Sequence, residues 1–135
     1  MILFLDACAI IYWVELIEPY YQQFSNKLMQ IKSVYGKLAF SASELSLLEC
    51  QVKPLREKNE ILLNRYNTMF TAPDLKLISL TTNVIQLATQ LRAKYHLATP
   101  DALQAASALS ISDNILFISA DKSFKKIPDL TVELI

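Results

Sequence analysis

Four acidic residues stand where a carboxylate could take part in chemistry. Asp6 and Asp121 each follow an apolar run of the kind found in buried strands. Asp101 opens an alanine-rich segment, and Glu49 lies among apolar neighbours. Carboxylates that gather in one place repel one another unless cations are bound, and hard divalent cations take oxygen ligands. The four acids therefore predict a divalent-cation site if the fold brings them together.

Each acid also has a purely structural interpretation. Asp6 is of a type favoured at helix N-caps, and Asp101 suits the positive end of a helix dipole. Asp121 could form a turn with the residues after it, and Glu49 could be an ordinary solvated helix residue. The sequence leaves both interpretations of each acid open.

Composition removes several other kinds of site. The single glycine, Gly36, excludes a P-loop, a dinucleotide-binding fingerprint and a nucleophile elbow. The single histidine, His96, has no Cys or His neighbour for zinc and no identifiable partner for a catalytic triad, so we expect an ordinary residue near a helix end. Cys8 and Cys50 are too few for a disulfide framework and are expected to be reduced, buried thiols.

Apolar runs and helical periodicity alternate along the 135 residues. The pattern predicts strands at 1–5, 38–40, 75–80, 115–118 and 131–134. It predicts helices at 7–16, 20–34, 44–50 and 55–70. Two further helices are expected, the first capped by Thr81 or Thr82 and the second starting after a Thr99 cap. Pro54 is expected to end or bend the third helix. Alternating strands and helices favour an α/β fold with a parallel sheet, and the length favours one domain, 1–135.

A parallel sheet would place three of the acids together. The carboxyl ends of parallel strands share one edge with the amino ends of the following helices, and ligands bind at that edge. Asp6, Asp101 and Asp121 are expected to converge there. Glu49, further along its helix, could point inward from the side.

The chain shows no feature of a membrane or exported protein. No apolar run approaches the roughly 20 residues of a membrane span, and residues 1–5 lack the basic region of a signal peptide. We therefore expect a cytoplasmic protein.

Four blocks of the sequence, in this order and spacing, resemble the PIN domain, and in particular the small VapC-type toxin ribonucleases. The blocks are ILFLDACAIIYW, FSASELSLLEC, TPDALQAASAL and LFISADKSFKKIPDLTV. In the second block, Ser43 and Ser46 precede Glu49 by six and three residues. The resemblance implies a single-domain α/β/α sandwich with a central, mainly parallel sheet. It also implies an acidic quartet on Asp6, Glu49, Asp101 and Asp121.

The resemblance further implies an activity and its partners. It implies a Mg²⁺- or Mn²⁺-dependent endoribonuclease that leaves a 5′-phosphate and a 3′-hydroxyl, with all four acids as metal ligands and Asp121 direct or through water. It also implies a toxin that forms a homodimer and is held inactive by a cognate antitoxin. The chain departs from the family pattern at Ala7, Cys8 and Ala120, whereas Ser119 keeps the hydroxyl of the usual Thr. These changes affect supporting hydrogen bonds more than metal ligands.

Basic and aromatic residues supply candidate contacts. Thirteen basic residues balance thirteen acidic ones, so the chain has no large basic surface for nucleic acid. Local phosphate contacts could come from Lys122, Lys125 and Lys126 beside Asp121, and from Arg92 and Lys94 before Asp101, although these residues could equally form a solvated face. The aromatic residues between Tyr12 and Phe24 are either a partner surface or part of the core.

Two other functions remain open from the sequence. One is a PIN-like module that binds RNA or protein without cutting; the presence of all four acids argues against it. The other is a metal-dependent phosphohydrolase that acts on DNA or flap structures. Divalent-dependent turnover would separate the first from a ribonuclease, and comparison of RNA with DNA would separate the second.

Overall fold

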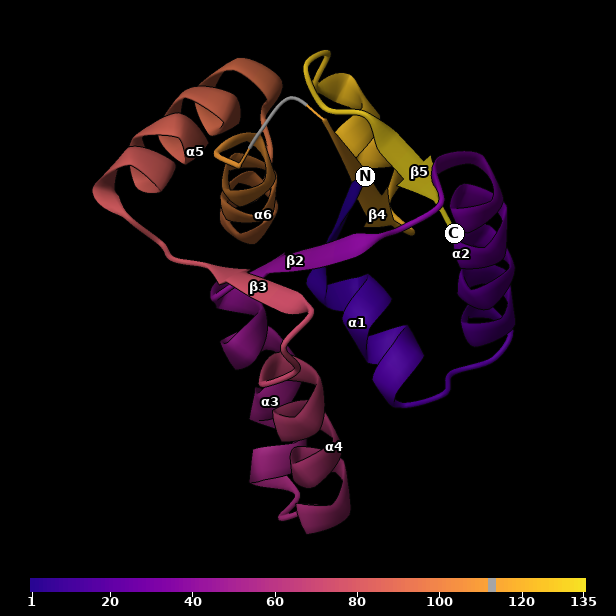
Figure 1. Ribbon diagram of the computed structural model, residues 1–135. Helices are drawn as coiled ribbons and strands as arrows, with labels where there is room; N and C mark the ends of the chain where they lie inside the picture. The colour runs from indigo at the N-terminus through magenta and orange to yellow at the C-terminus, as the bar shows by residue number, and fades with distance from the viewer. Residues whose placement is uncertain (112–113) are drawn as a thin grey trace.

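The computed structural model describes residues 1–111 and 114–135. Its centre is a five-stranded sheet in the order β3-β2-β1-β4-β5, and each neighbouring pair is parallel (Figure 1). The strands are β1 (Ile2–Leu5), β2 (Ala39–Ser43), β3 (Leu75–Ile78), β4 (Ile115–Ser119) and β5 (Val132–Leu134). The predicted parallel α/β sheet is confirmed.

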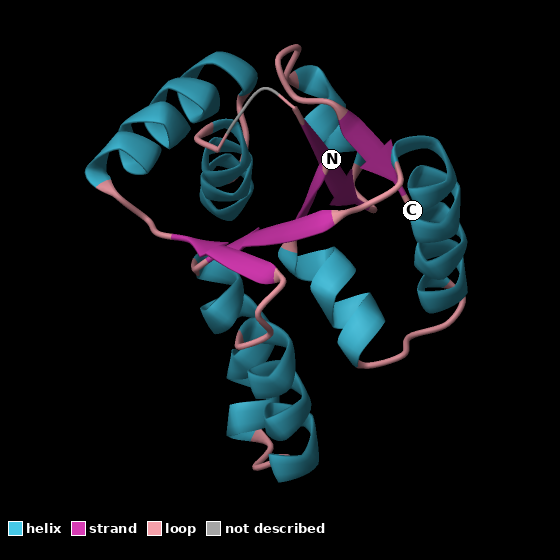
Figure 2. Cartoon of the chain, in the orientation of Figure 1, coloured by secondary structure: helices cyan, strands magenta, loops and turns pink. Residues whose placement is uncertain are grey.

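Helices cover both faces of the sheet (Figure 2). They are α1 (Ala7–Val14), α2 (Tyr20–Tyr35), α3 (Leu45–Arg56), α4 (Glu60–Phe70), α5 (Thr82–Tyr95) and α6 (Thr99–Leu109), with a 3₁₀ helix at Lys122–Lys126. α5 and α6 pack on one face, whereas α1 to α4 pack on the other, and the α3–α4 pair extends away from the sheet (Figure 1). This arrangement is the expected α/β/α sandwich. Within the described ranges, no helix is both long and apolar enough to cross a bilayer.

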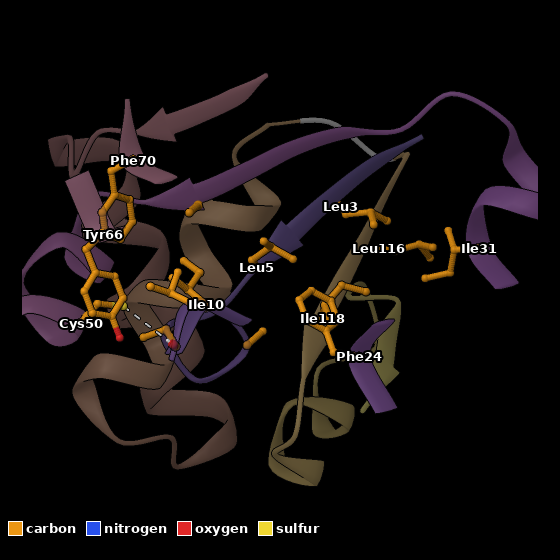
Figure 3. Close-up of a cluster of buried hydrophobic side chains, with 14 residues drawn as sticks. Leu3, Leu5, Ile10, Phe24, Ile31, Cys50, Tyr66, Phe70, Leu116 and Ile118 are labelled. Carbon is orange, nitrogen blue, oxygen red and sulfur yellow. Dashed lines mark hydrogen bonds between the residues drawn. The ribbon is translucent and has the colours of Figure 1, made fainter. Parts of the chain in front are cut away.

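Two hydrophobic clusters hold the layers together, and β1 contributes to both. Leu3 and Leu5 point toward the face covered by α1 to α4, where they join the cluster shown in Figure 3. Phe4 points to the opposite face and stacks on Phe117, its partner in β4, with ring centroids 5.4 Å apart. All three β1 side chains are at most 2% exposed. A strand that is apolar on both faces explains why the opening run lacks alternation.

Three helix boundaries differ from the prediction. Pro54 lies inside α3, which continues to Arg56. The next helix begins at Glu60 rather than Leu55, because Asn59 caps it by accepting the Leu62 N–H at 3.1 Å. Thr99 is the first residue of α6 and not its cap. A proline within the last turn costs the helix only one backbone hydrogen bond, so α3 can continue past Pro54. The Asn59 cap, and not Pro54, therefore sets the start of α4.

Candidate active site

The candidate site lies at the edge of the sheet where the parallel strands have their carboxyl ends. Asp6 follows β1 directly, and Asp121 follows β4 by two residues. Asp101 lies in the first turn of α6, and Glu49 lies in α3, which begins two residues after β2. The topology therefore brings the acids from four separate segments toward one edge.

Asp6 is a buried carboxylate with fixed hydrogen bonds. Its side chain is 5% exposed, and its Oδ1 accepts the N–H of Ala9 at 2.8 Å, which caps α1. Burial raises its pKa to about 6, although hydrogen bonds from Ser119 and Ala9 oppose the rise; the negative charges of Asp101 and Glu49 raise the pKa further. The capping interpretation is thus confirmed, and the same side chain also feels two of the other acids.

Ser119 connects the acids that follow β1 and β4. This last residue of β4 is fully buried, and its side chain hydrogen-bonds to Asp6. Its Oγ also accepts the backbone N–H of Asp121 at 3.0 Å. Asp121 in turn accepts the N–H of Ser123 at 2.8 Å and caps the 3₁₀ helix, as the turn interpretation predicted.

Asp101 and Glu49 complete the group. Asp101 is half-buried, and its pKa is raised first by burial and then by the charges of Asp121 and Glu49. The carboxylate of Glu49 accepts a hydrogen bond from Gln104 Nε2 at 3.0 Å, so it is held from α6 and is not simply solvated. The charges of Asp101 and Glu49 thus raise the pKa of Asp6, and those of Asp121 and Glu49 raise the pKa of Asp101, which links the four acids electrostatically.

The acids have no basic partner in the described ranges. The one ion pair found there joins Lys27 to Glu133 and includes none of the four acids. Within the same ranges, no three His, Cys, Asp or Glu side chains lie close enough together to coordinate one metal ion as they stand. The donor set consists of oxygen atoms, which suits Mg²⁺ or Mn²⁺ and not zinc. It also suits an ion that keeps several waters and takes only one or two carboxylates directly.

The family of the chain follows from a comparison of its sequence with known families. The sequence model of the PIN domain matches residues 3–130. The chain belongs to the PIN domain family. The resemblance drawn from the four sequence blocks is therefore confirmed at the level of the family.

Solved structures show the same PIN fold over the whole chain. VapBC2 from Rickettsia felis, solved with a promoter DNA fragment, is 20% identical with a TM-score of 0.74, covering 100% of this chain and 99% of that chain. VapBC-1 from nontypeable Haemophilus influenzae is 16% identical with a TM-score of 0.75, and the match covers 99% of this chain and 98% of that chain. FitAcB from Neisseria gonorrhoeae is 17% identical with a TM-score of 0.67, and the match covers 98% of this chain and 96% of that chain. No curated protein matches the sequence.

The basic residues of this PIN domain lie in two different settings. Lys122 and Lys125 are exposed on the 3₁₀ helix next to Asp121. Arg92 donates its Nε–H to the carbonyl of Leu97 at 3.1 Å, and so braces the connection between α5 and α6. It also lines a cavity of about 640 Å³ beside these helices, whose lining contains none of the four acids. The lysines are thus better placed than Arg92 to hold a phosphate near the acids.

The early aromatic residues divide between core and surface. Phe24 is 1% exposed and packs edge-on against Trp13, whereas Tyr20 is 38% exposed and stacks on Tyr12 at 4.3 Å. Phe24 therefore belongs to the core, as one of the two interpretations predicted, whereas Tyr20 lies on the surface.

Sequence reasoning missed Gln104, which lies three residues after Asp101. The spacing of Asp101, Gln104 and Ser107 places three polar side chains along one side of an alanine-rich helix. Gln104 and Ser107 are buried, and each hydrogen-bonds to the β2–α3 segment. The polar periodicity was the available signal. His96 is the C-cap of α5, near a helix end as predicted. Cys8 and Cys50 are free thiols, and Cys50 is buried as predicted, but Cys8 is only half-buried, so the prediction of burial is wrong for Cys8.

Proposed function

We propose that this PIN domain is a divalent-metal-dependent endoribonuclease that acts as the toxin of a toxin–antitoxin pair. One observation carries the proposal: four acids share an edge of the sheet, one of them is deeply buried, and no basic residue pairs with them in the described ranges. Such a group of charges is stable with a bound cation and unfavourable without one.

The residues that would hold Mg²⁺ or Mn²⁺ are Asp6, Asp101 and Glu49, with Asp121 direct or through water. When bound, the cation supplies a lower pKa for a water molecule and offsets negative charge on a phosphodiester. Asp6 is suited to a ligand role because the Ala9 N–H and the Ser119 hydroxyl fix its carboxylate. Asp101 is half-buried and therefore reachable by substrate.

The remaining residues would hold the RNA and set its geometry. Lys122 and Lys125 follow Asp121 on an exposed 3₁₀ helix, where each ammonium group could contact a phosphate. A chain with no net charge has little long-range attraction for nucleic acid. We therefore propose that affinity comes from these local contacts and from the cation. The predicted products carry a 5′-phosphate and a 3′-hydroxyl.

We also propose a cognate antitoxin, a homodimer and a cytoplasmic location. Support comes from the fold, which this chain shares with two VapBC proteins. The partly exposed stack of Tyr12, near the end of α1, and Tyr20, at the start of α2, offers an apolar surface of the kind enriched at protein interfaces.

The test is cleavage by partner-free protein of matched RNA and DNA panels, single-stranded and structured, with Mg²⁺, Mn²⁺ or EDTA. The proposal predicts RNA cleavage that requires the metal and leaves 5′-phosphate ends. Cleavage of DNA alone would indicate a different phosphohydrolase. Binding of RNA or protein without metal-dependent turnover of any substrate, and without Mn²⁺ binding, would indicate a non-cutting module.

A further inference from the structure

The side-chain amide of Gln104 is buried between α6 and α3 and is only partly satisfied. Gln104 is 3% exposed. Its Nε2 donates to Ser46 Oγ and to Glu49 Oε1, each at 3.0 Å, whereas its Oε1 is buried and has no hydrogen-bond partner in the described part of the chain. An unsatisfied buried carbonyl is unfavourable, so packing alone does not account for an amide here.

The two bonds set the direction of the amide. Ser46 and Glu49 lie three residues apart on one side of α3, and both accept from the same nitrogen. Rotating the amide by half a turn would point its oxygen at the carboxylate of Glu49. The Gln104 N–H is therefore held toward Glu49 by electrostatics and by the second bond to Ser46.

The same bonds restrict Glu49. A glutamate on a helix has three rotatable bonds, and its carboxylate would otherwise be free to turn toward solvent. The charge of Glu49 raises the pKa of both Asp6 and Asp101, so the carboxylate that Gln104 holds is close enough to act on these two acids. Hydrogen bonds to a ligand from a neighbouring group orient it and tune its affinity for metal.

We propose that Gln104 is a positioning residue that holds the Glu49 carboxylate toward Asp6 and Asp101 for cation binding. The inference rests on the proposed function, because it takes Glu49 as a ligand. Gln104 acts only through Glu49.

The chain provides a matched control one turn along the same helix. Ser107 is also buried, and its Oγ lies 3.1 Å from Ser43 Oγ and donates to the Leu103 carbonyl at 2.8 Å. Ser107→Ala thus removes a buried α6 hydroxyl at the same interface with no direct bond to an acid. A purely structural role for this interface would make both positions behave alike.

The experiment measures Mn²⁺ binding to metal-free protein by calorimetry, with the electron paramagnetic resonance spectrum of the bound ion as a second readout. Gln104→Met keeps the side-chain length and removes the donor. We expect it to bind Mn²⁺ about tenfold more weakly, with an altered spectrum. Ser107→Ala should keep the wild-type affinity and spectrum. Ser46→Ala, which loosens the amide but leaves the Glu49 bond, should weaken binding less than Gln104→Met.

The outcomes separate the inference from the proposed function. Wild-type affinity in Gln104→Met, or equal losses in Gln104→Met and Ser107→Ala, would overturn the positioning role and leave the nuclease proposal standing. Absence of Mn²⁺ binding by the wild-type protein would overturn both. If Gln104→Met does not fold, Ser46→Ala decides, and an unchanged affinity there counts against the inference.

Discussion

The buried hydroxyl of Ser119 hydrogen-bonds to the carboxylate of Asp6 across the β1–β4 pair, and the same oxygen accepts the backbone N–H of Asp121 at 3.0 Å. One small side chain thus fixes a carboxylate at the end of one strand and the turn that carries a second acid after the neighbouring strand. Its place between Asp6 and Asp121 makes it a support for the candidate site.

Removing this support should weaken the site more than the fold. Ser119→Ala is expected to lower the free energy of unfolding by about 1–2 kcal/mol, because Asp6 and the Asp121 N–H lose a buried partner. Cleavage should fall about tenfold. Urea unfolding and single-turnover cleavage measure the two effects. Ser41→Ala is the control: Ser41 Oγ is buried without a partner among the described residues, so its loss should be neutral or stabilising. Equal effects in both variants would remove the special role of Ser119.

The raised pKa of Asp6 predicts a pH-dependent stability of the metal-free protein. The folded pKa of about 6 exceeds the ordinary value of 3.8, so the folded state holds this proton more tightly than the unfolded state. The contribution of Asp6 to the free energy of unfolding is therefore fully present below pH 3.8, where its carboxyl group is protonated, and is lost as the pH rises through about 6. Asp6→Asn should therefore stabilise the metal-free protein at pH 8, by up to about 3 kcal/mol. The advantage should fade toward pH 4, and chemical unfolding across this range in EDTA would show it. A destabilised Asp6→Asn protein at pH 8 is the contrary result.

The lysines beside Asp121 should act on RNA binding and not on the chemical step. Lys122→Ala with Lys125→Ala is expected to raise KM about tenfold with little change in kcat, and to reduce the salt dependence of RNA affinity. Fluorescence anisotropy with a labelled RNA at several salt concentrations measures the slope. Lys27, which pairs with Glu133 at 3.4 Å, provides a charge-matched control on α2. An unchanged slope in the double variant would place the RNA elsewhere.

A hydrogen bond between α4 and the end of α1 should affect stability alone. Tyr66 is fully buried, and its hydroxyl donates to a carboxylate oxygen of Glu15. Tyr66→Phe is expected to lower the free energy of unfolding by about 1–3 kcal/mol, since a bond to a charged group is lost. Metal-dependent cleavage should stay at the wild-type level under conditions where both proteins are folded. A selective loss of cleavage would extend the functional site to α4.

Local patterns were sufficient to predict most of the fold. The apolar run before Asp6 predicted β1 and its burial on both faces, and strand–helix alternation predicted the parallel sheet. Together these placed Asp6, Asp101 and Asp121 at one edge, because edge position follows from topology. Helix ends were less predictable: Pro54 marked a boundary that the Asn59 cap sets instead.

The contacts that tune the site were beyond sequence reasoning. Gln104 and Glu49 are 55 residues apart, and their hydrogen bond depends on how α6 packs against α3. The polar spacing of Asp101, Gln104 and Ser107 showed that α6 has a polar side but not which partners it meets. The electrostatic environment of Asp6 likewise depends on tertiary burial, which no local pattern specifies.

The most direct test of the central claim is single-turnover RNA cleavage by Asp101→Asn beside the wild-type protein, at saturating Mg²⁺ or Mn²⁺. Asp101 lies in the first turn of α6, where asparagine keeps the shape and removes the charge that acts on Asp6. The claim predicts an unchanged fold by circular dichroism and cleavage at least about a hundredfold slower, as expected when an interaction essential to the transition state is lost. Near-normal cleavage by a folded Asp101→Asn protein would contradict an acidic metal site at this edge of the sheet.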